Sequence, residues 1–203
     1  MSIVTPDAPS KLLKYEDIEI ILNFLEENEF TMRDKVLVMF CIYLGLERSI
    51  IRSLNWEMFN TDRTTIMFEN NRIIPIPRKL SEKLKQLEKE NKSKGIKGKF
   101  LFYTKYNKKF NVIYETSIND IFDKLQKIDM NDSKWKSFSP QYIRNCLIEI
   151  LFLNKFSIEE IVYLTGADLF SVSKIISYDE LCKSVNSKKN LLIKKHPFNC
   201  FLE

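Results

Sequence analysis

The sequence predicts a mostly α-helical protein with a small antiparallel β-sheet. Apolar residues recur at helical spacing through most of the chain, for example at Ile18, Ile21 and Leu25. Residues that cap helices precede several of these stretches. One stretch, TTIMFENNRIIPIP, instead places two short β-rich runs around an Asn-Asn pair, which is typical of a hairpin.

The N-terminal elements follow a lead-in at residues 1–10. Apolar spacing predicts a helix over residues 15–27. Thr31 is placed to cap a second helix, whose run VLVMFCIYLGL is apolar enough to be buried on most sides. A short helix after Gly45 is expected to turn Ile50, Ile51 and Leu54 inward, and Trp56 closes it.

The hairpin and the segments after it come next. Asn70 and Asn71 tolerate the positive φ of a tight turn, and Pro75 and Pro77 remove hydrogen-bond donors, so their strand is expected at a sheet edge. An amphipathic helix from Ser81 leads into a lysine-rich loop. Residues 101–103, LFY, are a candidate strand, and a helix is expected over residues 116–128.

The C-terminal helices have clear start signals. Ser139 and Pro140 are typical of an N-cap followed by the first helical position, and that helix is expected to end near Leu153. Ser157 and Glu160 form a capping box at the start of SIEEIVYLTGADLFSVSKIISY. These two short helices around a glycine fit a DNA-reading helix-turn-helix, a common chance pattern, or the supporting scaffold of an enzyme.

Composition excludes several protein classes. The 203 residues are 44% apolar and 12% aromatic, which is typical of a folded protein of one or two domains. No apolar run reaches the roughly 18 residues that span a membrane, and the N-terminus has no signal-peptide pattern. We therefore expect a cytoplasmic protein with no membrane partner.

The metal-ligating residue types are sparse. The single histidine is His196, and the cysteines are widely separated. These residues do not have the spacing of a zinc site, so we expect no metal and no cofactor. The four cysteines are Cys41, Cys146, Cys182 and Cys200.

Positive charge is clustered although the net charge is only +5. No acidic residue occurs between Asn91 and Tyr114, and the C-terminal tail has a second cluster. Clustered lysines indicate phosphate binding, but a solvated loop in a Lys- and Asn-rich chain gives the same pattern, and both interpretations stay open. The lysines are Lys92, Lys94, Lys97, Lys99, Lys105, Lys108 and Lys109, with Lys188, Lys189, Lys194 and Lys195 in the tail.

The order of these features resembles the catalytic domain of the tyrosine recombinases, the phage integrase family. The matching segments are YLGLERSIIRSLNWEMFNTDRTTIMF, RIIPIP, SPQYIRNCL and SIEEIVYLTG with a tyrosine after it. The resemblance runs from about Lys11 to Tyr178 and predicts three parts: a lead-in (1–10), an integrase-like domain (11–180) and a basic, aromatic tail (181–203). Family members usually carry a core-binding domain before this one, and whether this chain has lost it or is a fragment stays open.

The resemblance implies an active site that this sequence has largely lost. Family members brace the scissile phosphate with two arginines and a histidine or tryptophan, move protons with a lysine and a histidine, and attack with a tyrosine. Only Arg144 stands in its expected slot, and Glu69 with two asparagines fills the hairpin lysine slot. The other changed slots hold Glu47 for the first arginine, Gln141 and Ala167 for the two histidines, and Ile176 for the nucleophile.

Two displaced residues keep an enzyme open as an alternative. Arg48 follows the arginine slot and Tyr178 stands two positions beyond the nucleophile slot. On a helix these shifts rotate a side chain by about 100° and about 200°. An active, divergent recombinase would have to use Arg48, Arg144 and Tyr178 from these positions.

The sequence therefore predicts a protein that binds double-stranded DNA on an inactive recombinase scaffold, as a repressor, regulator or accessory factor of a phage or mobile element. Arg144, the lysines and Lys174 are the expected contacts, with Ser171 and Ser173 beside them; the alternative for Arg144 is a salt bridge with Glu47. A protein-interaction module is the other alternative. By resemblance, the tail with Phe198 and Phe201 is expected to dock on a second copy or on its own domain.

Overall fold

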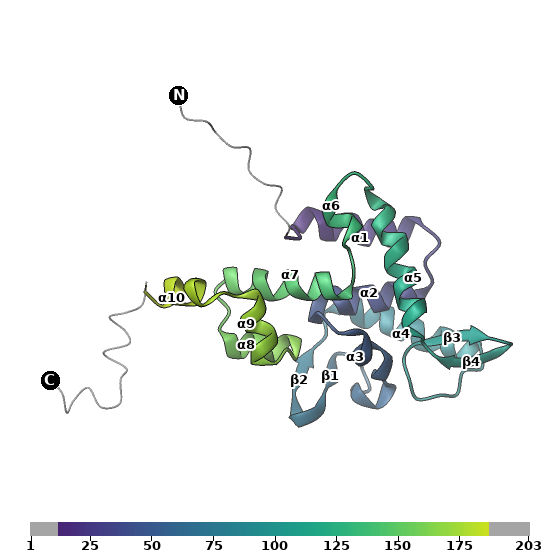
Figure 1. Ribbon diagram of the computed structural model, residues 1–203. Coiled ribbons are helices and arrows are strands. Elements are labelled where there is room, and N and C mark those ends of the chain that lie inside the picture. Colours follow the sequence, from purple (N-terminus) through teal and green to yellow (C-terminus); the bar gives the residue numbers. More distant parts are fainter. Residues whose placement is uncertain (1–11, 187–203) are drawn as a thin grey trace. The chain divides into compact units, whose positions relative to one another are not determined.

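The computed structural model describes residues 12–186 of the chain (Figure 1). These residues fall into two compact units, divided after Gly166. The predicted tail contacts, with Lys188, Lys189, Lys194, Lys195, His196, Phe198 and Phe201, lie outside the described residues.

Two helices start the first unit. Helix α1 (Tyr15–Glu27) and helix α2 (Met32–Leu44) each keep an acidic residue in the first turn. The Thr31 side chain accepts from the Asp34 backbone, which confirms the predicted cap. Helix α2 ends at Gly45, whose φ of 59° is the left-handed conformation that glycine adopts without strain.

The first sheet follows a short helical segment. Helix α3 (Arg48–Ser53) and the 3₁₀ helix η1 (Trp56–Met58) lead into strands β1 (Thr65–Met67) and β2 (Ile73–Pro75), joined by η2 (Glu69–Asn71). The strands are antiparallel with Ile66 opposite Ile74, and Asn70 and Asn71 have φ of 59° and 56°, as the hairpin prediction requires. The prediction for Ile50 was wrong: its side chain is exposed, while Ile51 and Leu54 are buried.

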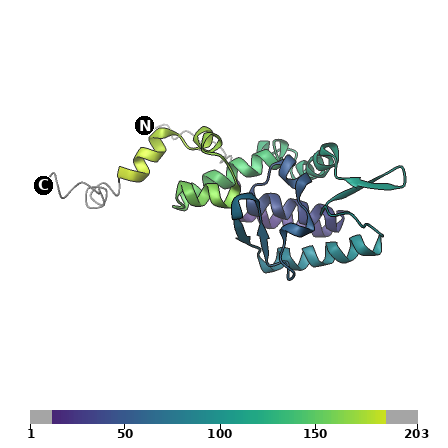
Figure 2. The same ribbon diagram turned by 90° about the horizontal axis from the view of Figure 1, so that it is seen from below.

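A second hairpin replaces most of the predicted lysine loop. Helix α4 (Arg78–Ser93) begins at Arg78 rather than at Ser81. Strands β3 (Tyr103–Tyr106) and β4 (Lys109–Val112) then pair antiparallel in a separate two-stranded sheet. The LFY strand at residues 101–103 was therefore placed too early: Leu101 and Phe102 anchor the hairpin in the core, and the β3–β4 ribbon extends away from the helices in both views (Figures 1 and 2).

The remaining elements complete the core. Helix α5 (Glu115–Leu125) continues into η3 (Gln126–Ile128), and α6 (Ser133–Lys136) precedes α7 (Pro140–Leu153) and α8 (Ile158–Thr165). Ser139 and Ser157 cap α7 and α8 as predicted. Helix α2 packs against α4 and α7, which explains why it is apolar on nearly all sides.

The second unit contains α9 (Leu169–Ile175) and α10 (Tyr178–Asn186). Together the two units confirm a mostly helical fold with small antiparallel sheets. Within residues 12–186, no helix is long and apolar enough to cross a membrane.

Candidate functional site

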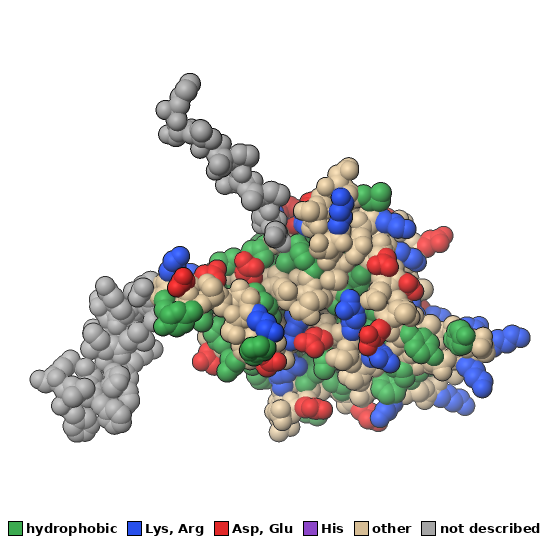
Figure 3. Space-filling model, in the orientation of Figure 1, with side chains coloured by type: hydrophobic (Ala, Val, Ile, Leu, Met, Phe, Trp, Pro, Cys, Tyr) green, Lys and Arg blue, Asp and Glu red, His purple; other side chains and the backbone are tan. Residues whose placement is uncertain are grey.

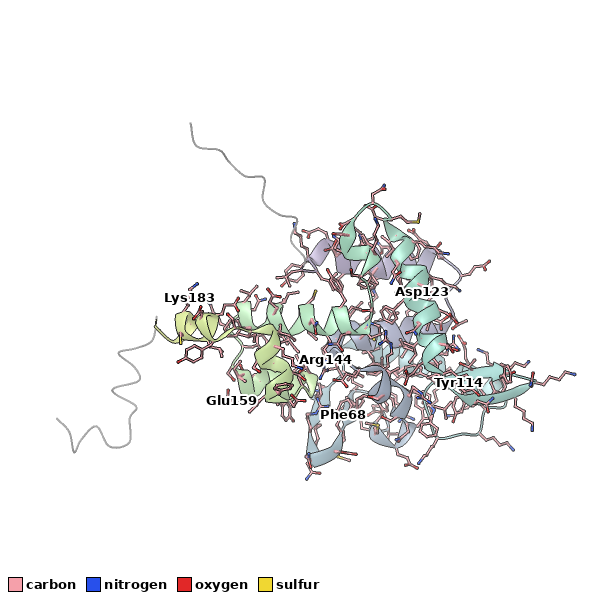
Figure 4. All side chains as sticks on the ribbon, in the orientation of Figure 1. Phe68, Tyr114, Asp123, Arg144, Glu159 and Lys183 are labelled. Carbon is pink, nitrogen blue, oxygen red and sulfur yellow. The ribbon has the colours of Figure 1, made fainter. Side chains whose placement is uncertain are left out.

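Arg144 lies at the centre of the candidate site. Its side chain is only 5% exposed, because α7 carries it toward the ends of two neighbouring helices. Nη1 donates to the Gly45 carbonyl oxygen at 2.6 Å and to the Thr165 carbonyl oxygen at 3.1 Å. Nη2 lies 3.2 Å from Oε1 of Glu47. Figure 4 labels Arg144 on α7. Arg144 thus joins the C-terminal ends of α2 and α8 to α7, and pairs with Glu47, at the position predicted as the first arginine slot.

Glu47 provides the exposed side of this pair. Its side chain is 48% exposed and stands at the N-cap position of α3. A cleft of about 230 Å³ lies beside it, and Gln141 lines the same cleft. The structure therefore brings together three positions that sequence spacing alone had linked, namely Glu47, Gln141 and Arg144. An anion entering this cleft meets two carboxylates, Glu47 and Glu115, and Arg144 lies behind Glu47.

Arg48 also lines the cleft but points elsewhere. Its Nε donates to Oδ1 of Asn119 on α5 at 3.0 Å. This contact agrees with the rotation expected for the residue after the arginine slot.

Arg72 is a cationic residue of the site that sequence reasoning missed. It follows the hairpin turn, and its Nη1 donates to the carbonyl oxygens of Tyr163 at 2.9 Å and Leu164 at 3.2 Å. Its guanidinium carbon lies 4.0 Å from the centre of the Phe68 ring. The sequence did contain one indication of its importance: Arg72 is the first residue of RIIPIP, a segment that resembles the family.

Arg72 and Arg144 share one local environment. Burial lowers the pKa of Arg72, and the positive charge of Arg144 lowers it further. Gly166 makes room for Arg72, because a Cβ atom there would lie 2.8 Å from its Nη2. The two arginines therefore supply hydrogen bonds to the last three carbonyl groups of α8, at the negative end of the helix dipole.

The second unit contains the two positions that the sequence analysis predicted as the slots for the later histidine and the nucleophile. Ala167 and Ile176 are both buried and apolar, so neither can donate a proton or attack phosphorus. Tyr178 is the first residue of α10, with 79% of its surface exposed. A hydrogen bond with Cys182 raises the pKa of Tyr178, which disfavours its phenolate form.

The predicted DNA-binding lysines fall into two groups. Lys92 and Lys94 end α4 in salt bridges of 2.9 Å with Glu88 and Glu90, which offset their charge. The other lysines lie in the loop and hairpin that follow, where positive side chains gather on the surface (Figure 3). This second group is Lys97, Lys99, Lys105, Lys108 and Lys109.

Three of the predicted lysines lie over aromatic rings, and the first is Lys99, whose Nζ is 5.5 Å from the Phe100 ring centre. Lys105 Nζ lies 6.0 Å from the Phe110 ring centre, and Lys174 Nζ on α9 lies 4.0 Å from the Phe170 ring centre. No cluster of metal-ligating side chains occurs within residues 12–186.

Comparisons with known proteins agree with this geometry. The model of the phage integrase family matches residues 11–173. Among solved structures, the Tn1549 transposon integrase in complex with circular intermediate DNA is 14% identical, with a TM-score of 0.66 over 90% of this chain and 67% of that one. No curated protein matches the chain.

Two recombinase structures are equally similar in fold. The XerA recombinase is 15% identical, with a TM-score of 0.63 over 91% of this chain and 66% of that one. The XerH site-specific recombinase, bound to its difH substrate before cleavage, is 14% identical, with a TM-score of 0.66 over 96% of this chain and 57% of that one. This chain thus spans about two thirds or less of the structures it matches. The family match and the shared fold together place the chain in the phage integrase family, with the fold of a tyrosine recombinase catalytic domain.

Proposed function

We propose that this protein binds double-stranded DNA without cutting it, and acts as a repressor, regulator or accessory factor of a phage or mobile element. The observation that carries the proposal is the pairing of Arg144 with Glu47 at 3.2 Å. In a catalytic site this arginine would face a phosphate whose charge grows in the transition state. Here a carboxylate of the same chain occupies that side of the guanidinium.

The tyrosine supports the loss of cleavage. A nucleophilic tyrosine needs a neighbouring base or a lowered pKa. Tyr178 instead has its pKa raised by Cys182, and buried apolar residues stand in the slots for the later histidine and the nucleophile. These features favour a protein that is not an enzyme.

The lysines support retained DNA binding. The Tn1549 integrase and the XerH recombinase are structures bound to DNA, and this chain has their fold. The five lysines between Lys97 and Lys109 provide the charge that phosphate contacts need, and Lys174 adds one on α9. Arg144 becomes a phosphate contact only if Glu47 gives way.

The test combines binding with a search for a covalent product. Labelled duplex DNA, intact or nicked as a suicide substrate, is incubated with the protein at about 50 mM and about 200 mM salt, and the samples are then run under denaturing conditions. We expect binding that weakens steeply with salt and no band that survives the denaturant. A resistant band lost in Tyr178→Phe would show an active recombinase and refute the proposal.

Charge reversal separates DNA binding from a role in protein interaction. Changing Lys97, Lys99, Lys108 and Lys109 to glutamate should abolish DNA binding and repression together. Repression that persists in this variant would favour a protein-interaction module.

Assembly and location belong to the same proposal. We expect the C-terminal tail to link copies of the protein and the DNA-bound protein to be associated with the nucleoid in the cytoplasm. Deleting residues 197–203 and measuring the mass in solution tests the first point. A monomer mass for both forms would exclude assembly through the tail.

A further inference from the structure

The β3–β4 hairpin is a two-stranded ribbon with a bonded base and an exposed tip. At its base, Arg33 Nη1 donates to the Tyr103 carbonyl oxygen at 3.0 Å, and Thr104 lies 3.3 Å from Ser117 in a hydroxyl hydrogen bond. The Tyr103 hydroxyl accepts from the Phe100 backbone at 3.0 Å. These contacts fix the direction of the strands before they leave the body of the protein.

The turn at the tip has a strained backbone, and a lysine stands at one of its two central positions. Asn107 and Lys108 have φ of 47° and 63°, and both values lie in the left-handed region. A two-residue turn of this type normally has glycine at its second position, and each other L-residue there costs about 1–2 kcal/mol. The chain nevertheless has Lys108, whose side chain is exposed at the outermost point of the ribbon. The tip therefore carries a positive charge at a position where glycine would be less strained.

The tip also exposes aromatic rings beside the lysines. Lys105 lies opposite Phe110, and Tyr106 lies opposite Lys109, so each face of the ribbon has one ring and one cation. Tyr106 is 62% exposed and Phe110 is 36% exposed. Exposed rings lose hydrophobic stabilisation in the free protein, but they gain it against bases and sugars. Alternating rings and lysines favour a nucleic-acid ligand over a purely electrostatic contact.

We propose that the β3–β4 hairpin enters the major groove of double-stranded DNA with Lys108 foremost and Tyr106 and Phe110 against its walls. This inference rests on the proposed DNA-binding function and assigns the element that performs it. Two paired strands lie about 4.8 Å apart, and with side chains they fill a groove about 12 Å wide but not one about 6 Å wide. Lys105 and Lys109 then flank the tip, in reach of the phosphates on either side.

The experiment measures binding of the full chain to a fluorescent mixed-sequence duplex of about 30 base pairs, roughly three helical turns. Lys108→Gly should weaken binding on the order of fivefold and reduce the salt slope by about 1, because one phosphate or base contact is lost. Its unfolding temperature should stay equal or rise by up to about 4 °C, because glycine relieves the turn.

A second variant and a control complete the design. Tyr106→Ala should weaken binding with little change in salt slope, since a ring contact carries no charge. Lys136→Ala removes the same charge as Lys108→Gly from an exposed position on α6 and should leave affinity within about twofold. Methyl green, which occupies the major groove, should displace the protein, whereas netropsin, which occupies the minor groove, should not.

The outcomes separate this inference from the function on which it rests. Absence of salt-dependent binding in the natural chain would refute DNA binding itself and the hairpin with it. Full affinity in both hairpin variants would refute only the hairpin as the binding element. Displacement by netropsin alone would overturn the major-groove assignment.

Discussion

Replacing Glu47 by glutamine tests whether the site around Arg144 still faces an anion. The substitution keeps the volume of the side chain and removes one negative charge 3.2 Å from Nη2 of Arg144. The two carbonyl partners of Arg144, from Gly45 and Thr165, remain in place. The variant therefore changes the charge in front of the guanidinium without removing its anchors.

The Glu47→Gln substitution is expected to lower the stability of the protein but to strengthen its binding to DNA. Glu47 is 48% exposed, so losing its ion pair with the buried Arg144 should lower the free energy of unfolding by only about 1 kcal/mol. For a phosphate about 5 Å from the Glu47 carboxylate, the repulsion removed is about 0.8 kcal/mol at the dielectric constant of water and about 3 kcal/mol at a value of 20. A half-exposed site lies nearer the lower figure, so DNA should bind about fivefold tighter.

Urea denaturation and fluorescence anisotropy at low salt measure the two quantities on the same samples. Glu19→Gln on α1 removes an exposed carboxylate of the same charge and controls for the change in net charge. If Glu47→Gln loses stability but binds DNA no better than Glu19→Gln, then Arg144 is a structural residue only. Its assignment as a phosphate contact would be refuted.

Three further substitutions or treatments have defined outcomes. Gly166→Ala should destabilise the protein by about 1–2 kcal/mol in urea, because its φ of 65° disfavours a side chain and the new Cβ would contact Arg72. Asp17→Asn should cost about 1.5–3 kcal/mol, because it removes a charged hydrogen bond to Lys134 while Asp132, 3.4 Å away, remains as a partner. Burial lowers the pKa of Lys134, but Asp17 and Asp132 outweigh burial, and the net pKa is raised. The stabilisation is therefore present from neutral pH up to about pH 10, and is lost as pH rises through the folded-state pKa. Burial raises the pKa of Cys41, so thiol reagents should modify it only after unfolding, as mass spectrometry can show.

The elements that the sequence predicted well are those specified by adjacent residues. Ser139 and Pro140 fix the start of α7, and Asn70 and Asn71 fix the first turn, because caps and tight turns depend on local backbone geometry. The second hairpin was missed for the same reason. Its turn is Asn-Lys rather than Asn-Gly, and its exposed lysines and aromatics do not give the apolar–polar alternation of a half-buried strand. The lysines that suggested a loop are the tip of a ribbon.

Only the residues of the candidate site that lie in motifs of the resembled family could be predicted from the sequence. The slots of Glu47, Gln141 and Arg144 were identified from motif order, and the structure brings them to one cleft and its wall. The part played by Arg72 was not predictable, because its carbonyl partner on Tyr163 lies 91 positions away in the sequence. Only packing of the hairpin near α8 makes that contact, and no local pattern reports it.

Because Arg72 and Arg144 both have a structural role, the presence of Arg144 is not by itself evidence of DNA binding. Helix α8 ends with carbonyl groups that have no partner within the helix, and Arg72 and Arg144 donate to the last three of them. A buried carbonyl left without a donor costs roughly 1–3 kcal/mol, so this fold requires Arg144 whether or not DNA is bound. An arginine in the family position is therefore expected even in a chain that never contacts a phosphate. The exposed, strained Lys108 has no comparable role in packing, so the proposal of DNA binding depends more on the β3–β4 hairpin than on Arg144.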